Sequence, residues 1–281
     1  ENGLVLVDEI SGEESRSRVD LIDRLTPGVN FDLVVVLVRK NKLAPIFKDL
    51  ADCPGISNIL FMGNNALGFD GYLEHLPRRK LLFGFPNAGG GFHGQVVHYA
   101  DRETAKGKRR AVVIGEIDGQ RSARLLEIIK LFQSASVPVE PPSNIDGWLK
   151  YHVALVSPLA GALYRHNCDN YELSKDKETL RLLIRAANEG ARVLGKLGFK
   201  ESEPPQFKLM KWMPESLSIM ALRKMLDSMF AEIAFAMHAR SARDEMIQLS
   251  AEFEALIELS LIRTPNIHAL AKDYGLSRQA I

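Results

Sequence analysis

The sequence has few cysteines and almost no net charge. Its only two cysteines, Cys53 and Cys168, lie far apart and form no Cys-x-x-Cys pattern. That usage argues against a disulfide framework or a zinc site, and it favours a reducing, cytoplasmic setting. The 36 Lys and Arg residues are balanced by 35 Asp and Glu residues, for a formal net charge of +1. This balance argues against a dedicated nucleic-acid or membrane-surface binder.

Long hydrophobic runs are also missing. No apolar stretch approaches the ~20 residues that a membrane span needs, and no signal peptide is visible. The chain opens on Glu1 and not on Met, so we expect its N-terminus to be a cut. The 281 residues, 46% of them hydrophobic and 25% charged, are typical of a soluble globular protein and sufficient for two domains.

Short apolar runs alternate with helical stretches in the first half. The clearest strand is Phe31 to Val38, a β-branched run typical of a strand that is buried on both faces. The other expected strands are Gly3 to Val7, Asn58 to Met62, Lys80 to Phe85, Val96 to Tyr99 and Ala111 to Gly115. The helices expected between them are Asn41 to Leu50, Gly71 to Leu76 and Ser122 to Ser134. This alternation predicts a mainly parallel sheet of Rossmann type.

The pattern changes after a proline-rich linker at residues 137–143. Apolar residues then recur at spacings of three and four, which predicts an all-helical second half. The expected helices are Ile145 to Arg165, Ser174 to Leu197 and Glu215 to Ile262, with Ser174 and Gly198 as caps of the second and Pro158 as a kink in the first. We therefore expect an α/β domain over residues 1–140 and a helical domain over residues 141–281.

Two loops in the first half carry residues suited to ligand binding. Gly63 to Gly68 follows an expected strand, and an Asn at that edge of a parallel sheet can bind a cofactor amide or a substrate carbonyl. Gly84 to Gly91 is rich in glycine, which permits close approach of backbone to a phosphate or a nicotinamide. A simple turn and a flexible connection are the structural alternatives, and from the motifs alone they are the commoner readings.

Three polar residues in the second half are further candidates. Lys150 opens the first expected helix; such a lysine is usually solvated, but in a cleft its ammonium can donate a proton. His152 projects about 200° away around the same helix, so one cleft can hold only one of the two. Glu245 is either a helix-surface carboxylate paired with an Arg or a ligand-binding group. Residues Ala271 to Ile281 resemble the turn of a helix-turn-helix, but the second helix of such a unit has no room in this sequence.

Taken in order, these pieces resemble the ketopantoate reductase (2-dehydropantoate 2-reductase) family over nearly the whole chain. Arg39, in Arg39-Lys40-Asn41-Lys42, lies where the family has a lysine-bearing loop beside the cofactor. Asn65 falls on the family's Asn-x-x-Gly motif, which contacts nicotinamide and substrate. Ala88 or Gly89 lies where the family's loop closes over the cofactor.

The resemblance continues into the helical half. Lys150, in Trp148-x-Lys150, matches the family's proton donor. Asn170, in Asn170-Tyr171-Glu172-Leu173, is similar to the family's Asn-Gly-Glu-Leu, whose Asn approaches the substrate. Glu245 matches the carboxylate that binds the cofactor from the helical domain. The resemblance implies that NADPH passes a hydride to a 2-oxo acid, with 2-dehydropantoate giving pantoate in pantothenate biosynthesis, and with a homodimer as the expected assembly.

Several family features have no counterpart here. The family opens on a strand and a Gly-x-Gly-x-x-Gly turn, and we expect that unit to be missing because the chain begins beyond it. Two family asparagines, four and eight residues after the lysine, are Ala154 and Pro158 here. The family's substrate-binding Ser has no clear match in the run Ala231 to Ala234.

These departures keep other functions open. A catalytically silent relative acting as a binding or interaction module is the first alternative, and a reductase of another carbonyl substrate is the second. A DNA-associated protein is a third, to be judged by whether residues beyond Ile281 complete a recognition helix.

Overall fold

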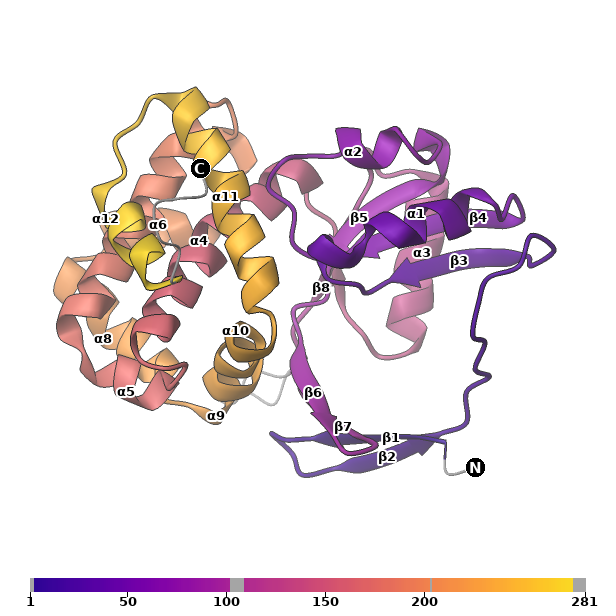
Figure 1. Cartoon of the computed structure of the whole chain (residues 1–281), viewed down its shortest axis with the longest axis horizontal. Coiled ribbons are helices and arrows are strands. Elements are labelled where there is room, and N and C mark those ends of the chain that lie inside the picture. The colour runs from indigo at the N-terminus through magenta and orange to yellow at the C-terminus, as the bar shows by residue number, and fades with distance from the viewer. Residues whose placement is uncertain (1–2, 102–108, 203, 275–281) are drawn as a thin grey trace. The chain divides into compact units, whose positions relative to one another are not determined.

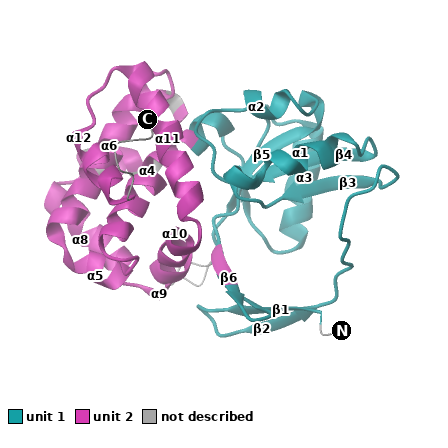
Figure 2. Ribbon diagram, in the orientation of Figure 1, with its two compact units in different colours: residues 1–88, 92–149 teal, residues 89–91, 150–281 magenta. Residues whose placement is uncertain are grey.

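The computed structural model describes residues 3–101, 109–202 and 204–274. It divides into two compact units, coloured separately in Figure 2. The first comprises Glu1–Ala88 and Phe92–Leu149, and the second comprises Gly89–Gly91 and Lys150–Ile281. The structural division thus follows Leu149, several residues beyond the proline-rich segment. The functional assignment of residues 1–140 and 141–281 stays a prediction.

A five-stranded sheet forms the centre of the first unit (Figure 1). Its order is β3-β4-β5-β8-β9, and β3, β4 and β5 run parallel. Strand β8 is antiparallel to β5, and the short β9 is parallel to β8. The strands are β3 (Phe31–Val36), β4 (Ile56–Met62), β5 (Leu81–Phe85), β8 (Val112–Gly115) and β9 (Val139–Glu140). This sheet confirms the predicted α/β class, although β9 lies in the segment expected to be a linker.

Both faces of this sheet are covered. Ile59 and Phe61 of β4 belong to a core cluster with residues of α1 (Ala44–Ala51) and α2 (Asp70–Leu73). Leu60 and Met62 belong to a second cluster with residues of α3 (Ala123–Ser134). Successive residues of a strand point to opposite faces, so an apolar run supplies both cores. The Ser122 hydroxyl caps α3 by accepting the Leu125 N–H, 3.1 Å away.

A second, four-stranded sheet has the order β2-β1-β7-β6. Its strands are β1 (Leu4–Asp8), β2 (Glu14–Ser17), β6 (Gly89–His93) and β7 (Val96–Ala100). Strands β1 and β7 were expected in the parallel sheet, but they pair with each other instead. Strand β2, with the sequence ESRS, and the glycine-rich β6 have no strand-like apolar pattern, and for this reason the sequence did not reveal them.

The described part of the second unit is helical apart from the three residues that belong to β6. The α-helices are α4 (Ile145–Arg165), α5 (Asn170–Lys175), α6 (Lys177–Lys196), α7 (Pro205–Trp212), α8 (Glu215–Leu226), α9 (Met229–Ala231), α10 (Met237–Ser241), α11 (Arg243–Ser260) and α12 (Pro265–Ala271). A π-helix, η4 (Glu232–Ala236), lies between α9 and α10. Short 3-10 turns complete both units: η1 (Lys40–Lys42), η2 (Arg78–Lys80), η3 (Lys200–Ser202) and η5 (Lys272–Tyr274).

Helix boundaries differ from the predictions at two points. The long helix expected from Glu215 to Ile262 is broken into α8, α9, η4, α10 and α11. Ser174 lies inside α5, and the cap of α6 is Asp176, whose carboxylate accepts the N–H groups of Glu178 and Thr179. Gly198 has a left-handed φ of 92° just beyond α6, as expected of a glycine at a helix end. The helix-turn-helix resemblance falls mostly on residues 275–281, outside the described ranges.

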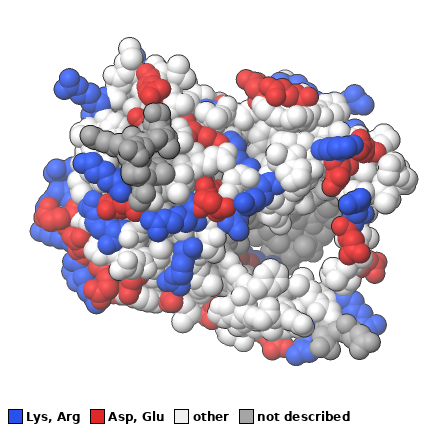
Figure 3. All heavy atoms as spheres, in the orientation of Figure 1, with Lys and Arg blue, Asp and Glu red and all other residues white. Residues whose placement is uncertain are grey.

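Charges of both signs are interspersed on the face shown in Figure 3. Within the described residues, no helix is long and apolar enough to cross a membrane. The same residues hold no group of three or more His, Cys, Asp or Glu side chains that could bind a metal ion.

Candidate functional site

The first unit gathers polar residues where its parallel strands end. The register aligns Val36 with Phe61 and Met62 with Gly84, so β3, β4 and β5 finish at the same edge. The Gly63 N–H donates to the Gly84 carbonyl at 3.1 Å and continues the pairing beyond the strands. Ligands of open α/β sheets bind at this carboxyl edge, because the loops there diverge.

Asn65 is held rigidly at this edge. Its side chain is buried, with 2% of its surface exposed. The Lys40 ammonium, which follows β3, donates to Asn65 Oδ1, and Asn65 Nδ2 donates to the Gly68 carbonyl at 2.7 Å. The Asn65 amide therefore connects the loops after β3 and β4, and it also closes the Gly63–Gly68 turn. Lys40 was not singled out in the sequence, although it lies in the cationic run directly after β3.

Arg39 precedes Lys40 and is exposed at the end of β3. Ala88 is exposed in the loop after β5, and Gly89 starts β6. A Cβ at Gly89 would collide with Ala234 of the π-helix η4, so the glycine permits close packing of backbone on that helix.

The run Gly89 to Gly94 also matches the pattern Gly-x-Gly-x-x-Gly, which was not identified from the sequence. It forms strand β6 and a following turn, and the next element is strand β7. A phosphate-binding glycine turn leads from a strand into a helix. This run is therefore no dinucleotide fingerprint.

Lys150 is buried near the start of α4. Only 5% of its surface is exposed, although a lysine there was expected to be solvated unless it faced a cleft. Its Nζ lies 5.0 Å from the centroid of the Phe199 ring, a distance suited to a cation–π interaction. Tyr151 beside it packs edge-on against Phe207, with ring centroids 5.2 Å apart, and fixes this turn of α4.

Asn170 is buried in the first turn of α5, with 2% exposed. Its Nδ2 donates to the carbonyls of Leu226 at 2.7 Å and Ser228 at 3.3 Å, so the amide connects α5 to the end of α8. The neighbouring Tyr171 hydroxyl donates to Glu232 of the π-helix at 3.0 Å. The Asn170 amide nitrogen is thus already engaged by two backbone carbonyls.

Glu245 lies in the first turn of α11 and is 2% exposed. Its Oε2 is 3.6 Å from His238 Nε2 on α10, and the positive end of the α11 dipole stabilises its charge. The alternative for Glu245 was a carboxylate on the helix surface, whereas the side chain is buried beside His238. His238 is a further candidate that the sequence did not reveal.

A buried tyrosine anchors the helices around Glu245. The Tyr164 hydroxyl donates to the Ala239 carbonyl at 2.9 Å, and the Arg243 guanidinium lies over its ring, 4.5 Å from the centroid. Burial raises the pKa of Tyr164 above its ordinary value. Tyr164 therefore remains a neutral donor that fixes α10 on α4.

The predicted site residues thus fall into two groups. Arg39, Asn65 and Ala88 belong to the first unit, and Gly89, Lys150, Asn170 and Glu245 belong to the second. The convergence of Asn65 with Lys150 and Glu245 concerns different units and stays a prediction.

Comparison with known proteins identifies the fold. No family model matches this sequence, and no curated protein matches it either. Solved structures do match over almost the whole chain. The fold is that of two-domain α/β reductases with a helical second half, and among them it is that of the ketopantoate reductases.

Three of these structures illustrate the match. One is 2-dehydropantoate 2-reductase from Geobacter metallireducens GS-15, 14% identical with a TM-score of 0.76, covering 98% of this chain and 86% of that one. D-mandelate dehydrogenase with NADH and anilino(oxo)acetate is 12% identical with a TM-score of 0.71, covering 98% and 84%. The dimeric ketopantoate reductase from Staphylococcus aureus is 14% identical with a TM-score of 0.67, covering 97% and 85%. The predicted resemblance is thereby confirmed at the level of the fold.

Proposed function

We propose that this protein is a nicotinamide-dependent reductase of a 2-oxo acid, with Lys150 as its proton donor. The observation that carries the proposal is the burial of Lys150 on α4, in a fold shared with reductases of 2-oxo acids. Holding an ammonium group away from water is costly unless it is paired, and the Phe199 ring faces this one as a cation–π partner. A buried lysine at the position that matches the family's proton donor supports that role.

The residues present fit a dinucleotide in part. Arg39 offers an exposed cation where β3 ends, suited to a phosphate, and Asn65 offers a fixed amide where β4 ends. Ala88 and Gly89 provide backbone in the following loop, and Glu245 provides a buried carboxylate for a ribose hydroxyl. NADPH is our proposed cofactor, and when bound it would supply the hydride.

The protein's own groups would manage charge and orientation. The Lys150 ammonium would stabilise negative charge growing on the substrate carbonyl oxygen and then transfer a proton to it. Asn65, fixed by Lys40 and Gly68, would orient the reacting groups. Asn170 Oδ1 would accept a hydrogen bond from a hydroxyl group of a substrate that carries one.

Which 2-oxo acid is reduced is the finer question. The resemblance favours 2-dehydropantoate, reduced to pantoate in pantothenate biosynthesis. However, Ala154 and Pro158 stand where the family has asparagines, and Ala154 is fully buried against Gly190. A Cβ at Gly190 would lie 2.9 Å from the Ala154 Cβ, so this contact leaves little room for a larger residue. This packing favours the alternative of a different carbonyl substrate.

The assembly and setting are also proposals. We expect a cytoplasmic homodimer, as one ketopantoate reductase of the same fold is described as dimeric. Leu209, Trp212 and Met220 are exposed on α7 and α8, with 58%, 88% and 62% of their surfaces accessible, and are candidates for the contact. Light scattering after gel filtration should give twice the 31.3 kDa chain mass.

The test is a panel of 2-oxo acids, including 2-dehydropantoate and phenylglyoxylate, incubated with NADPH or NADH. Consumption of the reduced cofactor is followed by absorbance and the hydroxy acid is identified by mass spectrometry. Turnover that is lost in Lys150→Met and kept in Lys196→Met supports the proposal. Lys196 serves as the control because it is an exposed lysine at the end of α6. Binding of a 2-oxo acid without turnover would favour the silent binding module.

A further inference from the structure

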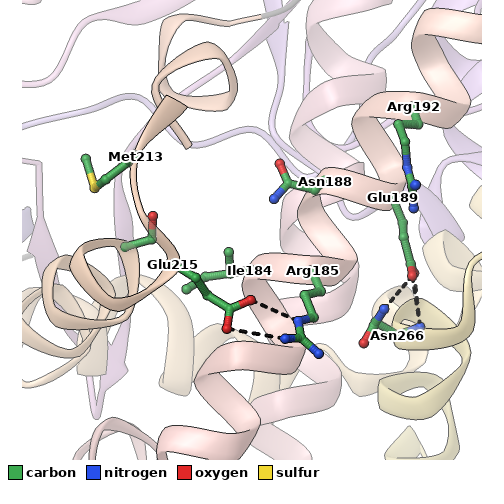
Figure 4. Close-up of a pocket in the computed structure, with 9 residues that line it drawn as sticks. Ile184, Arg185, Asn188, Glu189, Arg192, Met213, Glu215 and Asn266 are labelled. Carbon is green, nitrogen blue, oxygen red and sulfur yellow. Dashed lines mark hydrogen bonds and ion pairs between the residues drawn. The ribbon is translucent and has the colours of Figure 1, made fainter. Parts of the chain in front are cut away.

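A separate pocket lies in the helical unit, between α6, α8 and the start of α12. Its volume is about 630 Å³, within the range of sites for small molecules. Figure 4 shows Arg185, Asn188 and Arg192 along α6, with Met213 and Glu215 across from them. Ile184, Glu189, Ser218 and Asn266 complete the lining.

This pocket uses a different face of α6 from the one that packs on the Lys150 helix. Gly190 faces Ala154 of α4. Asn188 and Arg192 each lie two residues from Gly190, which places them about 200° away around the helix. Asn188 and Arg192 are one turn apart and share the pocket face. The pocket is therefore distinct from the surface assigned to Lys150.

Three of the four charged residues in the lining already have partners. Glu189, only 2% exposed, accepts the N–H groups of Asn266 and Ile267, each at 3.0 Å, and caps α12. Glu215 pairs with Arg185 and also with Arg181, each at 2.9 Å. Arg192 makes no ion pair or hydrogen bond with any residue that the structure describes. Arg192, whose side chain is exposed, is thus the one cation in the lining without a carboxylate partner among the described residues.

Two neutral polar groups of the lining also need partners. Ser218 Oγ and Asn188 Oδ1 are buried and have no hydrogen-bond partner within the described residues. Ser218 as a whole is only 5% exposed, so bulk water does not solvate its hydroxyl. An unsatisfied buried polar atom costs about 1–3 kcal/mol, and a bound group could remove that cost at both positions. One atom is a donor and the other an acceptor, which a hydroxyl group matches on both sides.

We propose that this pocket binds a small hydroxylated anion. Its carboxylate or phosphate group pairs with Arg192, and a nearby hydroxyl group donates to Asn188 Oδ1 and accepts from Ser218 Oγ. The site is independent of the proposed reductase activity, because none of its lining residues is assigned to that reaction.

The test is calorimetric titration of the full chain with two matched pairs of probes. 3-Hydroxyglutarate is compared with glutarate, and glycerol 3-phosphate with inorganic phosphate. In each pair only the first carries an alcohol hydroxyl group, and none is a 2-hydroxy acid. We expect the hydroxylated member to bind at least about fivefold more tightly, since one hydrogen bond is worth about 1 kcal/mol. The pair whose hydroxylated member binds more tightly shows whether the pocket prefers a carboxylate or a phosphate group.

Variants locate the binding. Arg192→Gln should weaken it at least about tenfold, because a hydrogen bond to a charged group is worth about 1.5–3 kcal/mol. Lys196→Gln removes the same charge one turn further along α6, outside the lining, and should leave the affinity within about twofold. Ser218→Ala should cancel the preference for the hydroxyl group without lowering the melting temperature of the free protein, because it deletes an unsatisfied group. Equal losses in Arg192→Gln and Lys196→Gln, or no binding of any probe, would overturn the proposal.

Discussion

At the scale of single residues, Lys150 is the sharpest test of the chemistry. A proton donor acts on charge that appears only in the transition state, so its loss lowers kcat more than cofactor affinity. Replacing Lys150 with Met should reduce kcat by about 10²–10⁴-fold, the usual contribution of general acid catalysis. NADPH affinity should change little. Steady-state kinetics and a fluorescence titration measure the two effects separately.

His152 provides the matched control for that prediction. It is half-buried, two residues along α4 and on a different face from Lys150. His152→Ala should retain most of the turnover. An inactive His152→Ala protein alongside a near-normal Lys150→Met protein would show that the donor is the histidine.

Glu245 should show the opposite pattern. Its buried carboxylate is assigned to a ribose hydroxyl, a contact made equally in the ground state and the transition state. Glu245→Gln should therefore raise the Kd for the cofactor about tenfold and change kcat little, because a hydrogen bond to a charged group is worth about 1.5–3 kcal/mol. Glu258→Gln, further along the same helix, is the control. A kcat loss with unchanged Kd would refute the assignment.

Residue types alone could not have selected these side chains. A lysine near a helix start is usually solvated, and only the structure shows that Lys150 is 5% exposed. The substrate contact predicted for Asn170 stays a prediction, and only the structure shows that its amide nitrogen donates to the Leu226 and Ser228 carbonyls, 56 and 58 residues away in sequence. Such tertiary hydrogen bonds leave no local sequence pattern. Lys40 and His238 were missed for the same reason.

At the scale of elements, the spacing of apolar residues predicted the elements that pack against a core. The three- and four-residue spacing predicted α4 because that helix buries apolar side chains. The apolar run predicted β3 as a strand, but the expected burial on both faces was wrong, because β3 is an edge strand in which only Val36 is buried. The exposed β2 and the glycine-rich β6 have no such pattern. The breaks around the π-helix η4 were also missed, since Glu232 to Ala236 carries neither Gly nor Pro. Tertiary packing sets such interruptions, and single π-helical turns often accompany functional sites.

The N-terminus of α6 allows a test through pH. Burial raises the pKa of Asp176, but hydrogen bonds from Thr179 and Glu178 and the charge of His166 outweigh it, so the pKa lies below its ordinary value. A carboxyl group of this kind stabilises the fold above its unfolded pKa, about 3.9, and loses that contribution as pH falls through its folded pKa. Asp176→Asn should destabilise the protein by about 0.5–1 kcal/mol at neutral pH.

That difference should disappear in acid. Denaturant unfolding of both proteins, repeated from neutral pH to below the folded pKa, measures it. Glu178→Gln removes a charge from the same helix turn and serves as the control. A destabilisation by Asp176→Asn that stays constant into acid would mean that the charge of the carboxylate contributes nothing.

At the scale of the whole molecule, the affinity for NADPH tests how well this chain binds a dinucleotide. The described strands provide Arg39 and Asn65 at their ends, but Gly89 to Gly94 forms a strand and does not lead into a helix N-terminus. We therefore expect this chain to bind NADPH more weakly than micromolar. Titration by NADPH fluorescence measures it, with NADH in parallel, and a micromolar Kd would contradict the expectation.

The pairing of β1 with β7 has a consequence for synthesis. Asp8 lies beside Tyr99, so the partner of β1 emerges from the ribosome 91 residues later. At about 5–20 residues per second, that interval is roughly 5–18 seconds. Until then β1 has only its hairpin with β2, and an isolated two-stranded hairpin is marginally stable. Strand β1 thus waits several seconds for its second neighbour, and during that time it is open to chaperones and proteases.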